Sequence, residues 1–219
     1  MAGLAEKLRH SANHIWRAIL KHPFVVELYS GALPPEKFRY YAIQDYNYLV
    51  TMYKCFSLIA SKAEYPLARK TLELAYTEAT TEMANYERLL DKLGMRLEDV
   101  VRVDPSPTNT AYMNFLLATC ALGSPLEGLV AVLPCFWSYA EIASKHKDKL
   151  ERNRNEIYVE WARVYTTKEY LDLVNELKAF VNEMAARESR EKLERIFITA
   201  SKYEYMFWDM AYRMEKWPI

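Results

Sequence analysis

The stretch PPEKFRYYAIQDYNYLVTMYKCFSLIASKA, residues 34–63, carries the clearest structural signal in this sequence of 219 residues. Two prolines open it, and proline suits the first turn of a helix because the N–H that it lacks would have no partner there. Large apolar residues then recur every three or four positions, the period of a helix with one buried face. This pattern predicts a long helix from Pro35 to about Ala63. The stripe consists of Phe38, Tyr41, Asp45, Tyr48, Met52, Phe56 and Ile59.

The helical period continues through the rest of the chain, and no segment alternates convincingly as a strand would. We therefore expect an all-α protein of eight to ten helices. Further helices are predicted for Leu4–Leu20, for HPFVVELYS before Gly31, and from Pro66 to Gly94. The segment MRLEDVVRVDPSPTNT is the longest irregular connection, with room for one short helical turn.

Hydroxyl side chains mark the starts of the remaining helices. Ser124, Pro125 and Glu127 form a capping box with proline at the first helical position. TTKE predicts a second capping box, formed by Thr166 and Glu169. The other predicted caps are Thr108 or Thr110 for a helix that ends before Gly123, and Ser189 for the last long helix.

Composition narrows the class of protein. Hydrophobic residues make up 51% of the chain, enough for one sizeable core, so residues 1–219 are expected to form a single domain. Lysine and arginine balance aspartate and glutamate at 29 each, which argues against a nucleic-acid binder. Neither a signal peptide nor an apolar run of about eighteen residues is recognisable. Three widely spaced cysteines argue against disulfides, so we expect a soluble, cytoplasmic protein that does not bind membranes.

Two acidic residues interrupt apolar stripes. Asp45 falls in the middle of the first stripe, and Glu204 takes a core position in a second one on the last helix: Leu193, Phe197, Ala200, Glu204, Phe207, Ala211 and Met214. A buried carboxylate is costly unless it is hydrogen-bonded or neutralised. Asp45 could be structural, bonded to tyrosine hydroxyls, and Glu204 could form an internal salt bridge. Alternatively, Glu204 has a raised pKa and serves as a general acid, with Asp45 in the same site.

Cys135 lies in VLPCFWSYAE, directly after Pro134. Counted from Ser124, that proline falls about two turns inside a helix, where it should produce a kink. Cys135 is either a small buried hydrophobe or a nucleophile, and the second role requires a neighbouring group that favours the thiolate.

The sequence contains no recognisable metal-binding or nucleotide-binding motif. None of the four histidines follows a glutamate at the spacing of di-iron bundles, and we expect His10 and His14 on an amphipathic surface. No glycine-rich phosphate-binding motif and no GxSxG motif occurs. We therefore expect no metal site.

Several stretches taken together resemble the TenA/thiaminase II family, whose fold is the all-helical heme-oxygenase-like bundle. The resemblance covers essentially the whole chain. The matching stretches are HPFVVELYSGALPPEKFRYYAIQDYNYL, SPTNTAY, LLATCALGSPLEGLVAVLPCFW, IYVEWARVY and SKYEYMFWDMAYRMEKW.

This resemblance implies a set of site residues. Cys135 matches the nucleophile, Glu204 the acid that protonates the pyrimidine ring, and Asp45 the carboxylate that holds its amino group. The implied substrate-binding residues are Tyr48, Tyr112, Tyr139, Tyr165 and Phe207. Two positions depart from the pattern: Tyr86 stands where relatives often have histidine, and Asn47 interrupts an aromatic stretch.

The implied reaction is hydrolysis of 4-amino-5-aminomethyl-2-methylpyrimidine, or of thiamin, to hydroxymethylpyrimidine in thiamin salvage. It proceeds through a covalent cysteine adduct without a cofactor, in a homotetramer. The sequence leaves open which of the two substrates is physiological. Two alternatives remain: a heme- or quinone-cofactor-binding protein, for which only His14 or His22 could be the axial ligand, and a non-enzymatic regulator.

Overall fold

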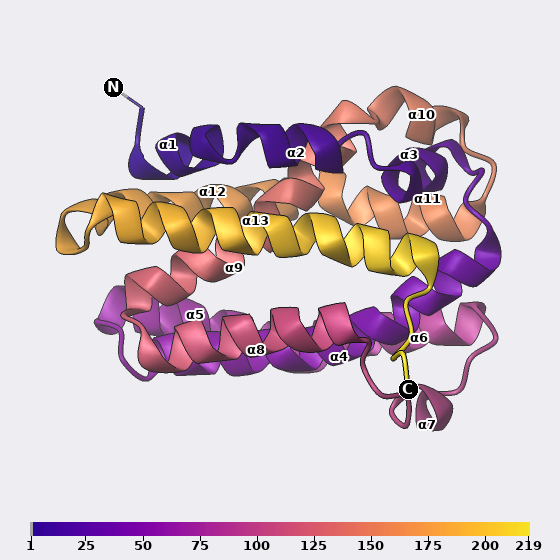
Figure 1. The fold of residues 1–219 in the computed structure, drawn as a ribbon, viewed down its shortest axis with the longest axis horizontal. Coiled ribbons are helices and arrows are strands. Elements are labelled where there is room, and N and C mark those ends of the chain that lie inside the picture. The colour runs from indigo at the N-terminus through magenta and orange to yellow at the C-terminus, as the bar shows by residue number, and fades with distance from the viewer. Residues whose placement is uncertain (1) are drawn as a thin grey trace. The chain divides into compact units, whose positions relative to one another are not determined.

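A computed structural model describes residues 2–219, and every regular element in that part of the chain is helical (Figure 1). The all-α prediction is therefore confirmed. Internal contacts divide the chain into two compact units. Unit 1 comprises the chain up to Leu33 together with Leu129–Asp209, and unit 2 comprises Pro34–Gly128 together with Met210–Ile219.

Unit 2 is organised around the long helix α4, Pro35–Ala60, which begins at the predicted proline. Every residue of the predicted stripe on this helix is buried. Helices α5 and α8 pack along α4, and Figure 1 shows them running beside it. The other elements of unit 2 after α4 are α5 Tyr65–Thr77, the π-helical turn Glu78–Glu82, α6 Met83–Lys92, α7 Leu97–Val100 and α8 Pro107–Leu122.

Unit 1 gathers helices from both ends of the sequence. Helix α3 packs against α10 and α11, and α1 packs against α12. Two helices, α9 Pro125–Lys145 and α13 Arg190–Arg213, contribute residues to both units. The remaining helices are α1 Leu4–Ser11, α2 Asn13–Ile19, α3 Pro23–Ser30, α10 Lys147–Arg152, α11 Glu156–Arg163 and α12 Lys168–Glu183, with 3-10 turns at Val164–Thr166 and Ala185–Arg187.

The predicted stripe of the last helix is confirmed except at its end. Its members from Leu193 to Ala211 are buried. Met214 is exposed, because α13 ends at Arg213 and Met214 has a positive φ of 50°.

The predicted number of helices is too low, since the described residues form thirteen α-helical segments. The expected helix Leu4–Leu20 is two helices, because the backbone at Ala12 leaves the helical region with φ −89° and ψ 7°. No glycine or proline marks that break. The expected helix from Pro66 is divided by the π-helical turn. The short helical turn predicted in the irregular connection is α7.

Two of the predicted N-caps are wrong, and in each case the cap is a residue nearby in the sequence. Helix α8 is capped by Ser106, whose hydroxyl accepts a bond from the Asn109 N–H, because Pro107 fixes the first helical position. Helix α12 is capped by Thr167 and not by Thr166, whose hydroxyl instead donates to the Arg163 carbonyl. Ser124 accepts from the Glu127 N–H as predicted.

Helix α9 is long and apolar enough to cross a membrane by length and composition. However, 83% of its most apolar 18-residue stretch is buried within the protein. It therefore has the character of a core helix.

Candidate active site

Helix α9 carries Cys135 at a position partly open to solvent. The helix continues through Pro134. The other two thiols, Cys55 and Cys120, are completely buried in unit 2. A hydrogen bond to Cys120, together with burial, raises the pKa of the Cys55 thiol, so that thiol stays protonated. Of the three cysteines, Cys135 alone has the exposure that a nucleophile requires.

The carboxyl group of Glu204 lies beside a serine hydroxyl from α9. Ser138 Oγ is 3.2 Å from Glu204 Oε2, and both side chains are almost entirely buried, at 1% and 3% exposure. The same Oγ lies 3.5 Å from the carbonyl oxygen of Cys135, one turn earlier. Ser138 thus connects the predicted acid to the backbone of the predicted nucleophile. Ser138 was not among the site residues predicted from the sequence.

A hydroxyl group has only one proton, so Ser138 cannot donate to both oxygens at once. When Glu204 is ionised, Ser138 donates to its carboxylate. When Glu204 is protonated, its O–H donates to Ser138, and Ser138 donates to the Cys135 carbonyl. Both protonation states of the acid therefore have a hydrogen-bond partner in this arrangement.

Aromatic rings from four elements, α9, α11, the turn Val164–Thr166 and α13, pack together in unit 1. The rings of Tyr139 and Tyr165 have centroids 4.8 Å apart, so the structure brings together two of the predicted binding residues. The ring centroid of Tyr139 also lies 5.1 Å from that of Trp208, and the ring centroid of Tyr165 lies 4.9 Å from that of Trp161. Phe207, next to Trp208 in the sequence, is buried on the same helix, α13, as Glu204. Rings arranged in this way can line a flat aromatic ligand.

A second acid centre lies in unit 2 on α4. Asp45 is buried, and the hydroxyls of Tyr41 and Tyr86 lie within hydrogen-bonding reach of its carboxyl group. Burial raises the pKa of Asp45 to about 7, although the two tyrosines act in the opposite direction. Of the predicted binding residues, Tyr48 and Tyr112 also belong to this unit, and their ring centroids are 5.2 Å apart.

Tyr86 is the residue at which this chain departs from the family pattern. Its hydroxyl donates to the carbonyl oxygen of Ala42 at 2.6 Å and also lies within reach of Asp45, so its one proton can go to either oxygen. The departure thus falls on a direct neighbour of a predicted site residue. The other departure, Asn47, has a side-chain nitrogen that is buried without a hydrogen-bond partner.

Glu78 is a further buried acid, and it was not among the site residues predicted from the sequence. It is the first residue of the π-helical turn and is 8% exposed. Burial, together with the charges of Glu82 and Asp45, raises the pKa of Glu78 to about 8. Periodicity could have found it, because Leu67, Thr71, Leu74 and Glu78 follow one face of α5 at intervals of four, three and four residues.

The predicted site residues therefore form two groups, each described within its own unit. Unit 1 holds Cys135, Glu204, Tyr139, Tyr165 and Phe207, and unit 2 holds Asp45, Tyr48 and Tyr112.

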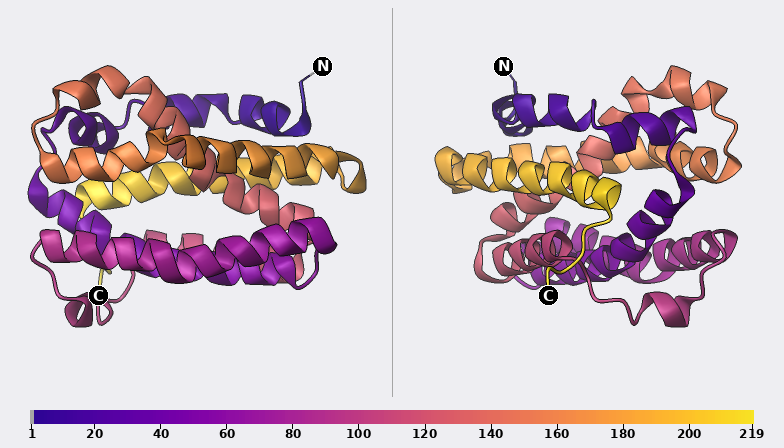
Figure 2. Two further views of the ribbon diagram at one scale, coloured as in Figure 1. Left: turned by 180° about the vertical axis from the view of Figure 1, so that it is seen from behind. Right: turned by 45° about the vertical axis from the view of Figure 1, so that its right-hand side comes forward.

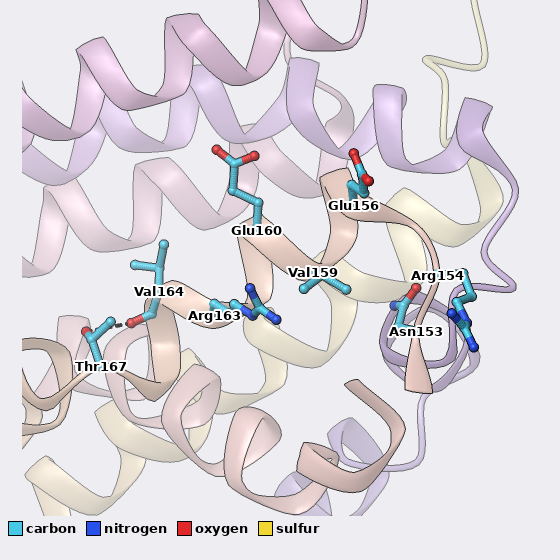
Figure 3. Close-up of a pocket in the computed structure, with 8 residues that line it drawn as sticks. All are labelled: Asn153, Arg154, Glu156, Val159, Glu160, Arg163, Val164 and Thr167. Carbon is cyan, nitrogen blue, oxygen red and sulfur yellow. Dashed lines mark hydrogen bonds between the residues drawn. The ribbon is translucent and has the colours of Figure 1, made fainter. Parts of the chain in front are cut away.

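An open hollow of about 660 Å³ lies along α11 of unit 1, apart from these residues. Figure 3 shows Glu156 and Glu160 extending to the same side of the helix, with Arg163 near its end. The full lining is Asn153, Arg154, Glu156, Val159, Glu160, Arg163, Val164 and Thr167. This lining carries no nucleophile and is of mixed charge.

The two histidines considered as heme ligands do not fit that role. His14 is exposed, as its predicted surface position requires. His22 is buried, but both of its ring nitrogens have neighbours. Nδ1 caps α3 by accepting a hydrogen bond from the Phe24 N–H, and Nε2 lies 3.6 Å from Asp209 Oδ1. Neither imidazole offers a free nitrogen inside the protein.

Comparison with known proteins gives concordant results. Residues 9–214 match the model of the TENA/THI-4/PQQC family. A relative named aminopyrimidine aminohydrolase, from Halalkalibacterium halodurans, is 34% identical, and the alignment covers 97% of each chain. The structure of a TenA homologue protein from P. horikoshii is 50% identical with a TM-score of 0.94, covering 97% of this chain and 99% of that one. A Shewanella denitrificans domain described as having a heme oxygenase-like fold superposes with a TM-score of 0.78 at 16% identity, covering 95% of this chain and 92% of that one.

Proposed function

Because this chain belongs to the TENA/THI-4/PQQC family and has the heme oxygenase-like fold, we propose that it is an aminopyrimidine aminohydrolase. The reaction converts 4-amino-5-aminomethyl-2-methylpyrimidine and water into 4-amino-5-hydroxymethyl-2-methylpyrimidine and ammonia, as a step of thiamin salvage. Thiamin is a second substrate, with the thiazole as its leaving group. The observation that carries the proposal is the link from Glu204 through Ser138 to the backbone of Cys135.

Cys135 acts as the nucleophile. Its thiolate adds to a carbon of the electron-poor pyrimidine ring while Glu204 protonates a ring nitrogen, which accepts the electron pair. The electrons then return to expel the protonated amino group from the exocyclic methylene, so that it leaves as neutral ammonia. Water adds to that methylene and releases one proton to solvent, and loss of the thiolate restores the aromatic ring.

Glu204 serves as the proton donor and acceptor of this sequence. It gives a proton to the ring nitrogen on addition and recovers it when the thiolate leaves. Ser138 supplies the hydrogen-bond partner that each protonation state of Glu204 needs. This support from one neighbouring hydroxyl keeps the carboxyl group in one place through both steps.

Asp45 binds the amino group of the pyrimidine through its carboxylate. The tyrosines and Phe207 contact the faces of the ring, a role that fits the ring contacts within each unit. The heme alternative is not supported by His14 or His22, and a purely regulatory role would give Cys135, Glu204 and Asp45 no common purpose.

We further propose that residues 1–219 act as one domain in the cytoplasm, as a homotetramer. The family match across residues 9–214 runs through both units and supports the single domain. Light scattering after size-exclusion chromatography tests the assembly, with an expected mass four times that of the 25.7 kDa chain. A mass of one chain would contradict it.

The function is tested by chromatographic detection of hydroxymethylpyrimidine from the aminomethyl compound and from thiamin. The wild type should form the product from at least one substrate, and Cys135→Ala should form none. Cys120→Ala is the matched control, since it removes a thiol that lies in the core of unit 2. Absence of product with folded wild type, or equal turnover by Cys135→Ala, would refute the proposal.

A further inference from the structure

The π-helical turn of unit 2 brings a second acid toward Asp45. In the left view of Figure 2, α5, the turn and α6 form one continuous run, and the turn packs against α4. A π-helical turn inserts an extra residue into a helix and so changes the direction of the side chains that follow it. Glu78 opens this turn, and the turn packs on α4, the helix that carries Asp45.

One oxygen of Glu78 has no hydrogen-bond partner. Its Oε2 is completely buried and unpaired, although more than nine-tenths of the residue is out of contact with water. Buried polar atoms in folded proteins are nearly always paired, because an unpaired one is destabilising. An unpaired carboxyl oxygen is therefore a place where a ligand with hydrogen-bond donors would be stabilised.

The surroundings of this oxygen favour a cation. The acids that act on Glu78 are Asp45 on α4 and Glu82 in the turn itself, and both raise its pKa by charge repulsion. The other groups at Asp45 are the hydroxyls of Tyr41 and Tyr86, which are neutral. A small positive group would relieve the repulsion and supply the missing donor. Among residues 2–219, no three histidine, cysteine or acidic side chains gather as metal ligands, so an ammonium group fits better than a metal ion.

We propose that Glu78 binds the protonated aminomethyl group of the substrate next to Asp45, and so selects the basic aminomethylpyrimidine over its neutral hydroxymethyl product. This inference rests on the proposed function and extends it to substrate preference. The two ligands differ only in that one carries NH₃⁺ where the other carries OH. A carboxylate distinguishes these groups through a charge-assisted hydrogen bond that only the ammonium makes.

The test compares the affinities of these two pyrimidines by isothermal titration calorimetry, with a Cys135→Ala background to prevent turnover. Glu78→Gln should weaken binding of the aminomethyl compound at least tenfold and change binding of the hydroxymethyl compound less than twofold. Glu73→Gln, on the exposed side of the same helical run, is the matched control and should change neither. Glutamine has nearly the size of glutamate, and thermal unfolding verifies that each variant is folded.

A second readout is proton release. The ammonium group lowers the pKa values of Glu78 and Asp45, so binding near pH 7 should release protons, measured in buffers of different ionisation enthalpy. Glu78→Gln should reduce this release. Equal loss of affinity for both ligands, or no loss for either, would overturn the role of Glu78 while leaving the hydrolase proposal intact. Failure of the parent Cys135→Ala protein to bind either pyrimidine, together with no turnover by the wild type, would instead count against the proposed function and with it the role of Glu78.

Discussion

The two acid centres of this protein, Glu204 in unit 1 and Asp45 in unit 2, share one feature of their construction. Each carboxyl group lies beside a hydroxyl that can also donate to a backbone carbonyl. Beside Glu204 this hydroxyl is that of Ser138, which also reaches the Cys135 carbonyl. Beside Asp45 it is that of Tyr86, which also reaches the Ala42 carbonyl. In each case the hydroxyl can donate to the ionised acid or accept from the protonated one.

The difference is the second acid at Asp45. Tyr41 adds another donor there, and Glu78 adds an interacting charge. An acid beside a hydroxyl that can either donate or accept is suited to giving and recovering a proton. A pair of buried acids, both with raised pKa values, is suited to ionising when a basic ligand arrives. We therefore assign proton transfer to Glu204 and ligand recognition to Asp45, and the following predictions test that division.

The largest effect is expected for Glu204→Gln. General acid catalysis contributes roughly 10²–10⁴-fold to a rate, so kcat for aminomethylpyrimidine should fall about a thousandfold. Affinity for the hydroxymethyl product should change little, because the amide keeps the size of the side chain. Steady-state kinetics and product titration measure the two quantities. If kcat falls less than tenfold while affinity falls strongly, Glu204 is a binding residue and the division is wrong.

Asp45→Asn should have the next largest effect, about a hundredfold loss in kcat/KM. Charge-assisted hydrogen bonds contribute about 1.5–3 kcal/mol, and the amide cannot accept as an anion does. The loss should appear mainly in KM, which kinetics over a range of substrate concentrations will show. In the wild type, kcat/KM should fall below about pH 7 as Asp45 becomes protonated. A loss confined to kcat would assign Asp45 to proton transfer instead.

Asp45 also makes a prediction about stability. Its pKa is raised from 3.8 to about 7 in the folded state, so the folded protein binds the extra proton between those values. The free energy of unfolding should therefore decrease as pH rises from about 4 to 7. Asp45→Asn should flatten that decrease, measured by urea unfolding across the range. An unchanged slope would show that Asp45 ionises in the folded protein as easily as in the unfolded chain.

Ser138→Ala should reduce kcat about tenfold, an intermediate effect. The bond that Ser138 donates to ionised Glu204 is charge-assisted and so stronger than the bond it accepts from the protonated acid, so its loss should move the alkaline limb of the kcat profile to higher pH. This shift distinguishes a role in proton transfer from simple loss of packing, which would lower kcat without moving the limb. Ser144→Ala, at an exposed position on the same helix, is the control and should leave the profile unchanged.

Much of this arrangement could be predicted from periodicity alone. The buried faces of α4 and α13 follow an unbroken helical period, so Asp45 and Glu204 were found as acids at core positions. Glu78 was missed although it continues the face of α5, because the π-helical turn that begins there obscures the pattern beyond it. Ser138 is a small polar residue whose partner lies 66 positions away, and no local signal reveals such a pair.

The smallest effect is expected for Tyr86→Phe, which removes one of the two hydroxyls at Asp45. Tyr41 still donates to the carboxylate, so kcat/KM should fall only about threefold. Loss of a donor raises the pKa of Asp45, and the acid limb of the kcat/KM profile should move to higher pH. Tyr76→Phe, exposed on α5, is the control. If Tyr86→Phe leaves the limb in place, its hydroxyl serves only the Ala42 carbonyl, and the likeness between the two acid centres does not hold.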